Sequence, residues 1–215
     1  HTELIAELCD CSNFAMMQSS ENLRVAFVTT HISLREVPNA ISKSRIIDVA
    51  KLLEHAIRAE GIKSPVIAVA ALNPHAGENG YMGSEENDII LPALNALREQ
   101  GIKIDGPFPP DTLFIEEIRT RYHGILAMYH DQGLIPFKLA SFESGVNYTA
   151  GLPVVRTSPA HGTAFSIAGE GKASPDSFRQ ALYLAIDIFN NRRIHAEISK
   201  NPLKNLLTPN FVFPY

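Results

Sequence analysis

Three histidines each follow an apolar stretch with the length of a buried strand. They are His31 after residues 25–30, His75 shortly after residues 66–72, and His130 after residues 124–129. Ligands of open α/β sheets bind just beyond the carboxyl ends of the strands, so these histidines could meet in one pocket. Three neutral imidazoles with open coordination positions suit a catalytic zinc, cobalt, nickel or iron ion. A single histidine more often bonds its own loop, but three in matching positions favour a shared site.

Polar residues also interrupt the apolar stretches that follow His130. Lys138, Asn147 and Arg156 would supply a point charge, an amide and a planar guanidinium. This mixture could clamp a phosphate or a carboxylate. Solvated strand edges explain the same residues equally well, so both interpretations stay open on composition alone.

Two glycine-containing loops could approach a ligand. Residues 73–80 combine a proline-fixed turn with glycines, which is typical of a binding loop and, equally, of an ordinary surface turn. Residues 161–173 suggest a phosphate loop, but Ser166 and Ala173 stand where a Walker loop needs glycine and a serine or threonine. No GxGxxG follows a strand pattern either, so any dinucleotide is held in another way.

The elements that must position these residues alternate between strand and helix. We predict strands at 23–30, 65–72, 102–104 and 124–129, and helices from Thr2 and at 39–60, 84–100, 112–121 and 176–193. Extended pieces are predicted at 135–139, 147–149 and 153–156, loops at 73–83, 106–111 and 158–175, and a short helix with a tail at 200–215. This alternation favours a largely parallel sheet with helices on its faces.

Composition narrows the classes of protein. The chain has 215 residues, 45% of them hydrophobic and 20% charged, with a net charge of −4. This charge gives no electrostatic reason to expect nucleic acid, and no stretch is long enough to span a membrane. Cys9 and Cys11 are too close for an ordinary disulfide, so we expect reduced thiols in a cytoplasmic protein.

Several motifs, in order along the chain, resemble the 4-hydroxythreonine-4-phosphate dehydrogenase family. They are Thr29-Thr30-His31, Asn73-Pro74-His75-Ala76-Gly77-Glu78, Met128-Tyr129-His130-Asp131-Gln132-Gly133, Gly151-Leu152-Pro153 and Arg156-Thr157-Ser158. The segment 161–175 also resembles the adenosine-binding loop of the wider isocitrate and isopropylmalate dehydrogenase superfamily. The resemblance covers nearly the whole chain and is weakest in the C-terminal tail.

The resemblance implies an α/β fold, an α/β/α sandwich of two domains with a central cleft. Residues 1–155 would form the metal- and substrate-binding domain, which also dimerises. Residues 156–215 would be the returning C-terminal part of the NAD-binding domain, whose N-terminal part precedes His1 in the family, so we expect an upstream segment. The family also implies a homodimer with its active site at the subunit interface.

The resemblance further implies a role for individual residues. The metal ligands match His31, His75 and His130, and the substrate-binding residues match His1, Thr2, Lys138, Asn147 and Arg156. The loop residues His161, Gly162, Thr163 and Ala164 would contact NAD, and Asp111, Asp131 and Lys138 are candidates for proton handling during catalysis. The implied cofactors are NAD and a divalent metal, which could be zinc, cobalt or magnesium.

The implied reaction belongs to vitamin B6 biosynthesis. It is the oxidation and decarboxylation of 4-phosphooxy-L-threonine, a small phosphorylated substrate, to 3-amino-2-oxopropyl phosphate. One alternative is a paralogous dehydrogenase that acts on a four-carbon sugar-acid phosphate such as threonate or erythronate 4-phosphate. Another is a non-catalytic fragment that binds metal or phosphate. An isocitrate-type enzyme is disfavoured, because such enzymes bind their metal largely through carboxylates.

Overall fold

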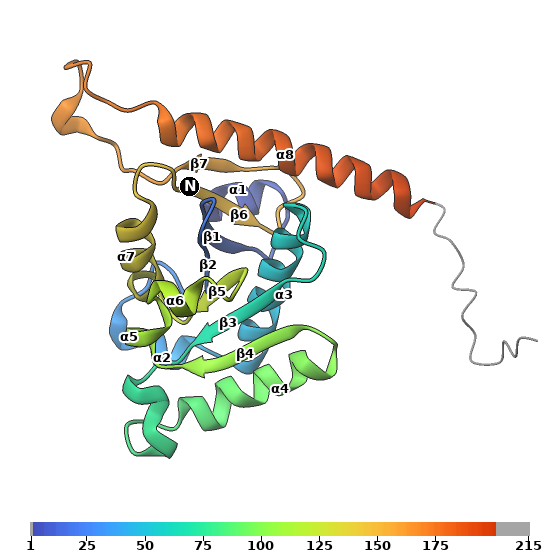
Figure 1. Cartoon of the computed structure of the whole chain (residues 1–215), viewed down its shortest axis with the longest axis vertical. Coiled ribbons are helices and arrows are strands. Elements are labelled where there is room, and N and C mark those ends of the chain that lie inside the picture. Colours follow the sequence, from blue (N-terminus) through green and yellow to red (C-terminus); the bar gives the residue numbers. More distant parts are fainter. Residues whose placement is uncertain (1, 201–215) are drawn as a thin grey trace, which may run out of the picture.

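The computed structural model describes residues 2–200 and shows a seven-stranded mixed sheet in the order β4-β3-β5-β2-β1-β6-β7 (Figure 1). Four neighbouring strands are parallel, namely β4 (Lys103–Phe108), β3 (Val66–Ala70), β5 (Gly124–Ala127) and β2 (Arg24–Phe27). The other three, β1 (Ala15–Ser19), β6 (Val146–Ala150) and β7 (Thr157–Pro159), pair antiparallel. The α/β fold is therefore confirmed, and half of the sheet is parallel.

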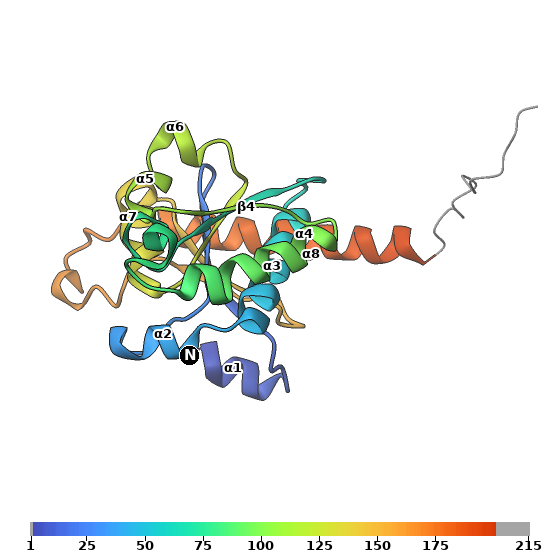
Figure 2. The same ribbon diagram turned by 90° about the horizontal axis from the view of Figure 1, so that it is seen from below.

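Helices cover both faces of this sheet (Figures 1 and 2). One face packs on α3 (Lys43–Ala59), α4 (Leu91–Glu99) and α8 (Asp176–Ser199). The other packs on α5 (Pro110–Leu113), α6 (Glu116–Arg119) and α7 (His130–Ser141). The central strands are buried on both faces, which is why their sequences are continuously apolar.

Helix α3 confirms most of the predicted helix 39–60, but it begins at Lys43 because Ile41 and Ser42 are extended. Ser42 caps the helix by accepting a hydrogen bond from the backbone N–H of Arg45, at 3.2 Å. Its inward residues recur at helical spacing, and Ile46, Val49, Leu53 and Ile57 are fully buried. The helix ends at Glu60 and Gly61, where the sequence predicts its end.

The prediction of an extended piece at 135–139 is wrong, because these residues belong to α7. That helix begins at His130, directly after the predicted strand 124–129, and Pro136 lies inside it. A Cβ at Gly133 would lie 2.6 Å from Val25 and 2.9 Å from Phe27, so the helix approaches the sheet closely there. This packing outweighs the poor helix propensity of glycine and proline.

Other differences concern the edges of elements. Strand β1 (Ala15–Ser19) lies where the sequence predicts no element, and pairing on both sides completes its backbone hydrogen bonds. The predicted strand 102–104 continues to Phe108 and so includes part of the predicted loop 106–111. In place of the single helix predicted at 112–121 there are two short helices, α5 and α6. The extended piece 153–156 precedes β7, and the helix 84–100 opens with the π-helical turn Glu86–Ile90. The predicted helix and tail beyond residue 200 lie outside the described residues.

Two short helices and two 3₁₀ turns lie at the surface. The helices are α1 (Thr2–Leu8) and α2 (Val37–Ala40), and the 3₁₀ turn Leu34–Glu36 leads directly into α2. The 3₁₀ turn Phe165–Ile167 interrupts the loop before α8. Within residues 2–200, no helix is long and apolar enough to cross a membrane.

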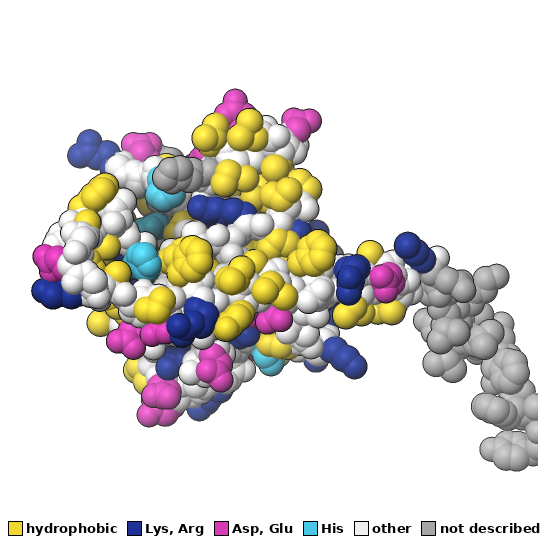
Figure 3. All heavy atoms as spheres, turned by 90° about the horizontal axis from the view of Figure 1, so that it is seen from above, with side chains coloured by type: hydrophobic (Ala, Val, Ile, Leu, Met, Phe, Trp, Pro, Cys, Tyr) yellow, Lys and Arg dark blue, Asp and Glu magenta, His cyan; other side chains and the backbone are white. Residues whose placement is uncertain are grey.

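Helix α8 carries an exposed apolar face. Its buried residues, Ser177, Ala181 and Ile188, face the sheet. Its large exposed apolar residues are Phe178, Leu182, Tyr183, Ile186, Phe189, Ile194 and Ile198. Seen from above, apolar side chains gather over this helix (Figure 3). An apolar surface of this extent is typical of an interface.

Candidate functional site

Side chains tie together the three strand ends that precede the histidines. Thr29 beyond β2 donates its hydroxyl to the carbonyl of Met128 beyond β5, at 2.8 Å. The buried carboxamide of Gln132 accepts from the Met128 N–H at 2.7 Å and donates to the Ala71 carbonyl beyond β3 at 2.6 Å. These hydrogen bonds connect the ends of β2, β5 and β3, the three strands that precede the predicted metal ligands.

His31 and His130 come together at this end of the sheet. Their ring centroids are 5.8 Å apart with planes inclined at 47°. His130 also stacks on Phe27, with ring centroids 5.8 Å apart at 30°. This contact restrains His130, whereas the His31 side chain is 59% exposed.

Each of the two rings is oriented by a carboxylate. Nδ1 of His31 lies 3.1 Å from Glu3 Oε1, and Nδ1 of His130 lies 2.8 Å from Asp131 Oδ1. A bond to the backbone N–H of Glu3, and next the bond to His31, hold the pKa of the Glu3 carboxyl below its ordinary value. A carboxylate on Nδ1 leaves Nε2 as the ligating atom, which is the usual support of a metal-binding histidine.

His75 lies in a left-handed loop beyond β3. Residues 75–79 all have positive φ values, between 44° and 77°. The buried carboxylate of Glu86 holds this loop by accepting from the backbone N–H groups of Leu72, at 2.8 Å, and Asn73, at 2.7 Å. A Cβ at Gly77 would lie 2.6 Å from Glu86 Oε2, so glycine is required there.

Within residues 2–200, no group of three histidine, cysteine or carboxylate side chains is close enough to hold a metal ion. His31 and His130 thus form a pair, and His75 stands apart from them on an adjoining strand end. Within residues 2–200 the Nε2 atoms of these two imidazoles have no hydrogen-bond partner. Such a pair suits a borderline cation such as zinc or cobalt, so the donor set fits a divalent metal. The assignment of all three histidines to one ion stays a prediction.

The predicted substrate residues are only partly brought together. Arg156 donates to the hydroxyl of Thr2 at 3.2 Å and to that of Thr149 at 3.0 Å. Asn147 lies on the same sheet face as Thr149, two residues along β6, and its Oδ1 is buried without a hydrogen-bond partner among the described residues. Lys138 is half-buried on α7, the helix that covers this face. His1 lies outside the described residues.

The remaining predicted residues are exposed. His161, Gly162, Thr163 and Ala164 form a surface loop in which His161 Nδ1 donates to the Gly162 carbonyl at 2.9 Å. Ala164 has a positive φ of 52°. Asp111 is exposed on α5, and Asp131 faces His130.

A family profile described as "Pyridoxal phosphate biosynthetic protein PdxA" matches residues 1–185 of the chain. The chain belongs to the PdxA family. This membership agrees with the resemblance that the order of the histidine motifs indicates.

Individual relatives agree with this assignment. A 4-hydroxythreonine-4-phosphate dehydrogenase from Bacteroides thetaiotaomicron is 51% identical over 95% of this chain and 57% of its own length. A D-threonate 4-phosphate dehydrogenase from Pectobacterium atrosepticum is 45% identical over 87% of this chain and 58% of its own length. The crystal structure of 4-hydroxythreonine-4-phosphate dehydrogenase from Klebsiella pneumoniae superposes with a TM-score of 0.77 at 47% identity, covering 87% of this chain and 57% of that one. The chain thus spans less than two thirds of the length of these relatives.

In this PdxA-family chain, some residues that build the site carry no local signal of that role. Glu86 lies within the predicted helix 84–100, although it holds the His75 loop. Gln132 lies within one of the histidine motifs, but nothing local indicates its hydrogen bonds to the strand ends. Glu3, which orients His31, carried no signal beyond its place in an N-terminal helix.

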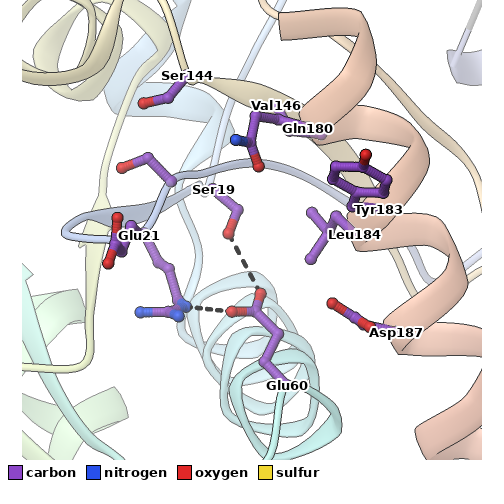
Figure 4. A pocket seen from close by; sticks show the side chains of 11 residues that line it. Ser19, Glu21, Glu60, Ser144, Val146, Gln180, Tyr183, Leu184 and Asp187 are labelled. Atoms are coloured by element: carbon purple, nitrogen blue, oxygen red, sulfur yellow. Dashed lines mark hydrogen bonds and ion pairs between the residues drawn. The ribbon is translucent and has the colours of Figure 1, made fainter. Parts of the chain in front are cut away.

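A pocket of about 270 Å³ lies elsewhere on this family member, between the β1–β2 turn, the end of α3 and α8 (Figure 4). At its base Arg24 pairs with Glu60 at 2.5 Å, and Ser19 donates to Glu60 at 3.2 Å. Arg24 begins β2, whereas His31 follows the end of that strand, so the pocket and the histidines lie at opposite ends of the sheet. None of the predicted site residues lines it.

Proposed function

We propose that this chain forms the metal- and substrate-binding part of an NAD-dependent 4-hydroxythreonine-4-phosphate dehydrogenase. The reaction oxidises the secondary hydroxyl of 4-phosphooxy-L-threonine, and loss of carbon dioxide then gives 3-amino-2-oxopropyl phosphate in vitamin B6 biosynthesis. The observation that carries this proposal is the His31–His130 pair at the strand ends, with both Nε2 atoms left for a ligand. The names of the most similar relatives support it.

His31, His75 and His130 would hold a divalent cation, for which zinc, cobalt and magnesium are the candidates. When bound, the cation would supply Lewis-acid polarisation of the substrate hydroxyl. Asp131 and Glu3 would keep the two paired imidazoles oriented toward it. NAD, the hydride acceptor, would contact the exposed loop 161–164.

The phosphate of the substrate would bind at Arg156. The contacts of Arg156 with Thr2 and Thr149 restrain the guanidinium, so that less side-chain entropy is lost on binding. Lys138 and Asn147 would add a cation and an amide from α7 and the same sheet face. Binding energy from this remote group would position the reacting carbon. Lys138, Asp111 and Asp131 remain candidates for moving protons.

We further propose that residues 1–155 form the metal- and substrate-binding domain and that 156–215 return to an NAD-binding domain. The exposed apolar face of α8 supports this division, since seven large apolar side chains lie open on one helix. A homodimer whose active site lies at the subunit interface would bring a further ligand to the histidine pair.

The free cysteines Cys9 and Cys11 are compatible with a cytoplasmic enzyme.

A second candidate substrate is D-threonate 4-phosphate, because a relative of that name is 45% identical to this chain. The two substrates differ at the carbon that carries either an amino group or a hydroxyl. Both would use the same metal and phosphate residues. The sequence and the fold are therefore compatible with both compounds, and the rate of turnover of each compound discriminates between them.

The test begins with the intact mass and the N-terminal sequence of the purified protein, which define the polypeptide that is assayed. NADH formation is then measured with each phosphorylated substrate, with and without added divalent metal. We expect metal-dependent NADH from 4-phosphooxy-L-threonine and its loss in His75→Ala. Faster turnover of D-threonate 4-phosphate would replace the first candidate by the second. Metal binding without NADH from either substrate would favour a non-catalytic fragment.

A further inference from the structure

A second pocket, of about 310 Å³, lies between the C-terminal end of α3 and the second half of α8. Its lining residues are His55, Arg58, Ala59, Lys63, Asn191, Arg192 and His195. Asn191 and His195 continue, at helical spacing, the α8 face that is buried on the sheet at Ile188. The pocket is therefore distinct from the exposed apolar face of the same helix.

Hydrogen bonds hold the donors of this pocket in place. Asn191 donates to the Ala59 carbonyl at 2.6 Å and so covers the end of α3. Arg192 donates to the Leu152 carbonyl at 3.2 Å and to the Tyr148 hydroxyl at 3.0 Å. Because Arg192 is already fixed in one orientation, a ligand would cost little additional side-chain entropy.

Arg58 is held in the same way. Its guanidinium pairs with Glu54 and donates to the Lys63 carbonyl. These contacts hold the segment after α3, in which Lys63 lines the pocket.

The charge of the pocket selects anions. Its described lining includes three cationic side chains, Arg58, Lys63 and Arg192, and two imidazoles, but no carboxylate. Lys63 and Arg192 form no ion pair within residues 2–200, whereas Arg58 is paired. The chain as a whole has a net charge of −4. The positive charge of this pocket therefore reflects the local grouping of cationic side chains and not an excess of basic residues in the chain.

We propose that this pocket binds a small molecule that carries a phosphate group. Guanidinium and ammonium groups make strong, charge-assisted hydrogen bonds to phosphate oxygens. The volume exceeds what a phosphate alone requires and leaves room for a small organic group. Helices α3 and α8 cover the sheet face opposite α7, so this site is separate from His130 and from the proposed catalytic reaction.

Titration with inorganic phosphate at constant ionic strength tests the proposal. The imidazole NMR signals of His55 and His195 report on the pocket, and we expect them to shift together with one apparent Kd. The variant Lys63→Glu reverses an exposed charge and should weaken this binding roughly tenfold or more. Lys51→Glu, an exposed change on α3 outside the pocket, is the matched control and should leave the Kd unchanged.

A second variant separates this pocket from the proposed substrate site, which would also bind phosphate. Arg156→Ala should leave the shifts of His55 and His195 intact. Loss of those shifts in Arg156→Ala, or their full retention in Lys63→Glu, would overturn the proposal. So would the absence of any shift in the unaltered protein. Each result can be read without any activity measurement.

Discussion

The imidazole rings of His31 and His130 lie 5.8 Å apart at the ends of the neighbouring parallel strands β2 and β5. Each ring has a carboxylate on Nδ1, Glu3 for one and Asp131 for the other. The pair is thus oriented for a ligand at Nε2 although the two residues are distant in the sequence. The parallel register of β2 and β5 is what brings them together.

This pair predicts the effect of removing either ring on metal binding. His31→Ala or His130→Ala should each weaken Co²⁺ binding by roughly tenfold or more, because each would remove a proposed ligand. Absorbance titration with Co²⁺ measures the change. His195→Ala, an exposed histidine on α8, should bind Co²⁺ as the unaltered protein does. Unchanged affinity in both variants of the pair would contradict the metal assignment.

A substitution at Gln132 tests how much its hydrogen bonds between the strand ends stabilise the fold. Gln132→Leu would leave the Met128 N–H and the Ala71 carbonyl without their partner. We expect the free energy of unfolding, measured by urea denaturation, to fall by about 2–4 kcal/mol, since buried polar groups without partners are costly. Gln100→Leu, at an exposed position, should change it by less than about 0.5 kcal/mol. Equal effects would show that the bridge is unimportant.

A substitution at Gly77 tests how rigidly Glu86 holds the His75 loop. Gly77→Ala adds a Cβ 2.6 Å from Glu86 Oε2 at a φ of +77°, whereas Gly61→Ala meets nothing within 4 Å at a φ of +102°. The free energy of unfolding should fall by about 1 kcal/mol for Gly61→Ala and by about 2–4 kcal/mol for Gly77→Ala. Thermal or urea unfolding of both variants measures the difference. Similar losses would mean that Glu86 moves aside freely.

Tyr148 predicts a loss of stability in alkaline solution. Burial raises the pKa of its hydroxyl above the ordinary value of 10, although the nearby Arg192 opposes the shift. Above about pH 10 the unfolded chain loses this proton and the folded chain keeps it, so stability falls as pH rises. Burial also raises the pKa of Tyr122, which is less enclosed. We measure the free energy of unfolding at increasing pH. Its decrease above about pH 10 should be reduced more by Tyr148→Phe than by Tyr122→Phe.

Local pattern was sufficient for the elements with strong periodicity. The apolar runs of β2, β3 and β5 and the amphipathic pattern of α3 are properties of adjacent residues, so the sequence alone predicts them. Helix α7 could not be predicted in this way. Gly133 and Pro136 disfavour a helix locally, and only contact with Val25 and Phe27 on the sheet makes the helix stable there.

The sequence by itself determined the order of the histidine motifs, the α/β class and the membership of the family. Each depends on residue types and spacings that are present in the unfolded chain. Only the tertiary structure decided that His31 and His130 form a pair, that His75 does not join them in a group of three ligands within residues 2–200, and that Glu86 holds the loop that carries His75. Strand order and long-range hydrogen bonds such as that from Gln132 to Ala71 set these distances, and neither has a local signature. The physical reason is that contact between distant residues is a property of the packed sheet.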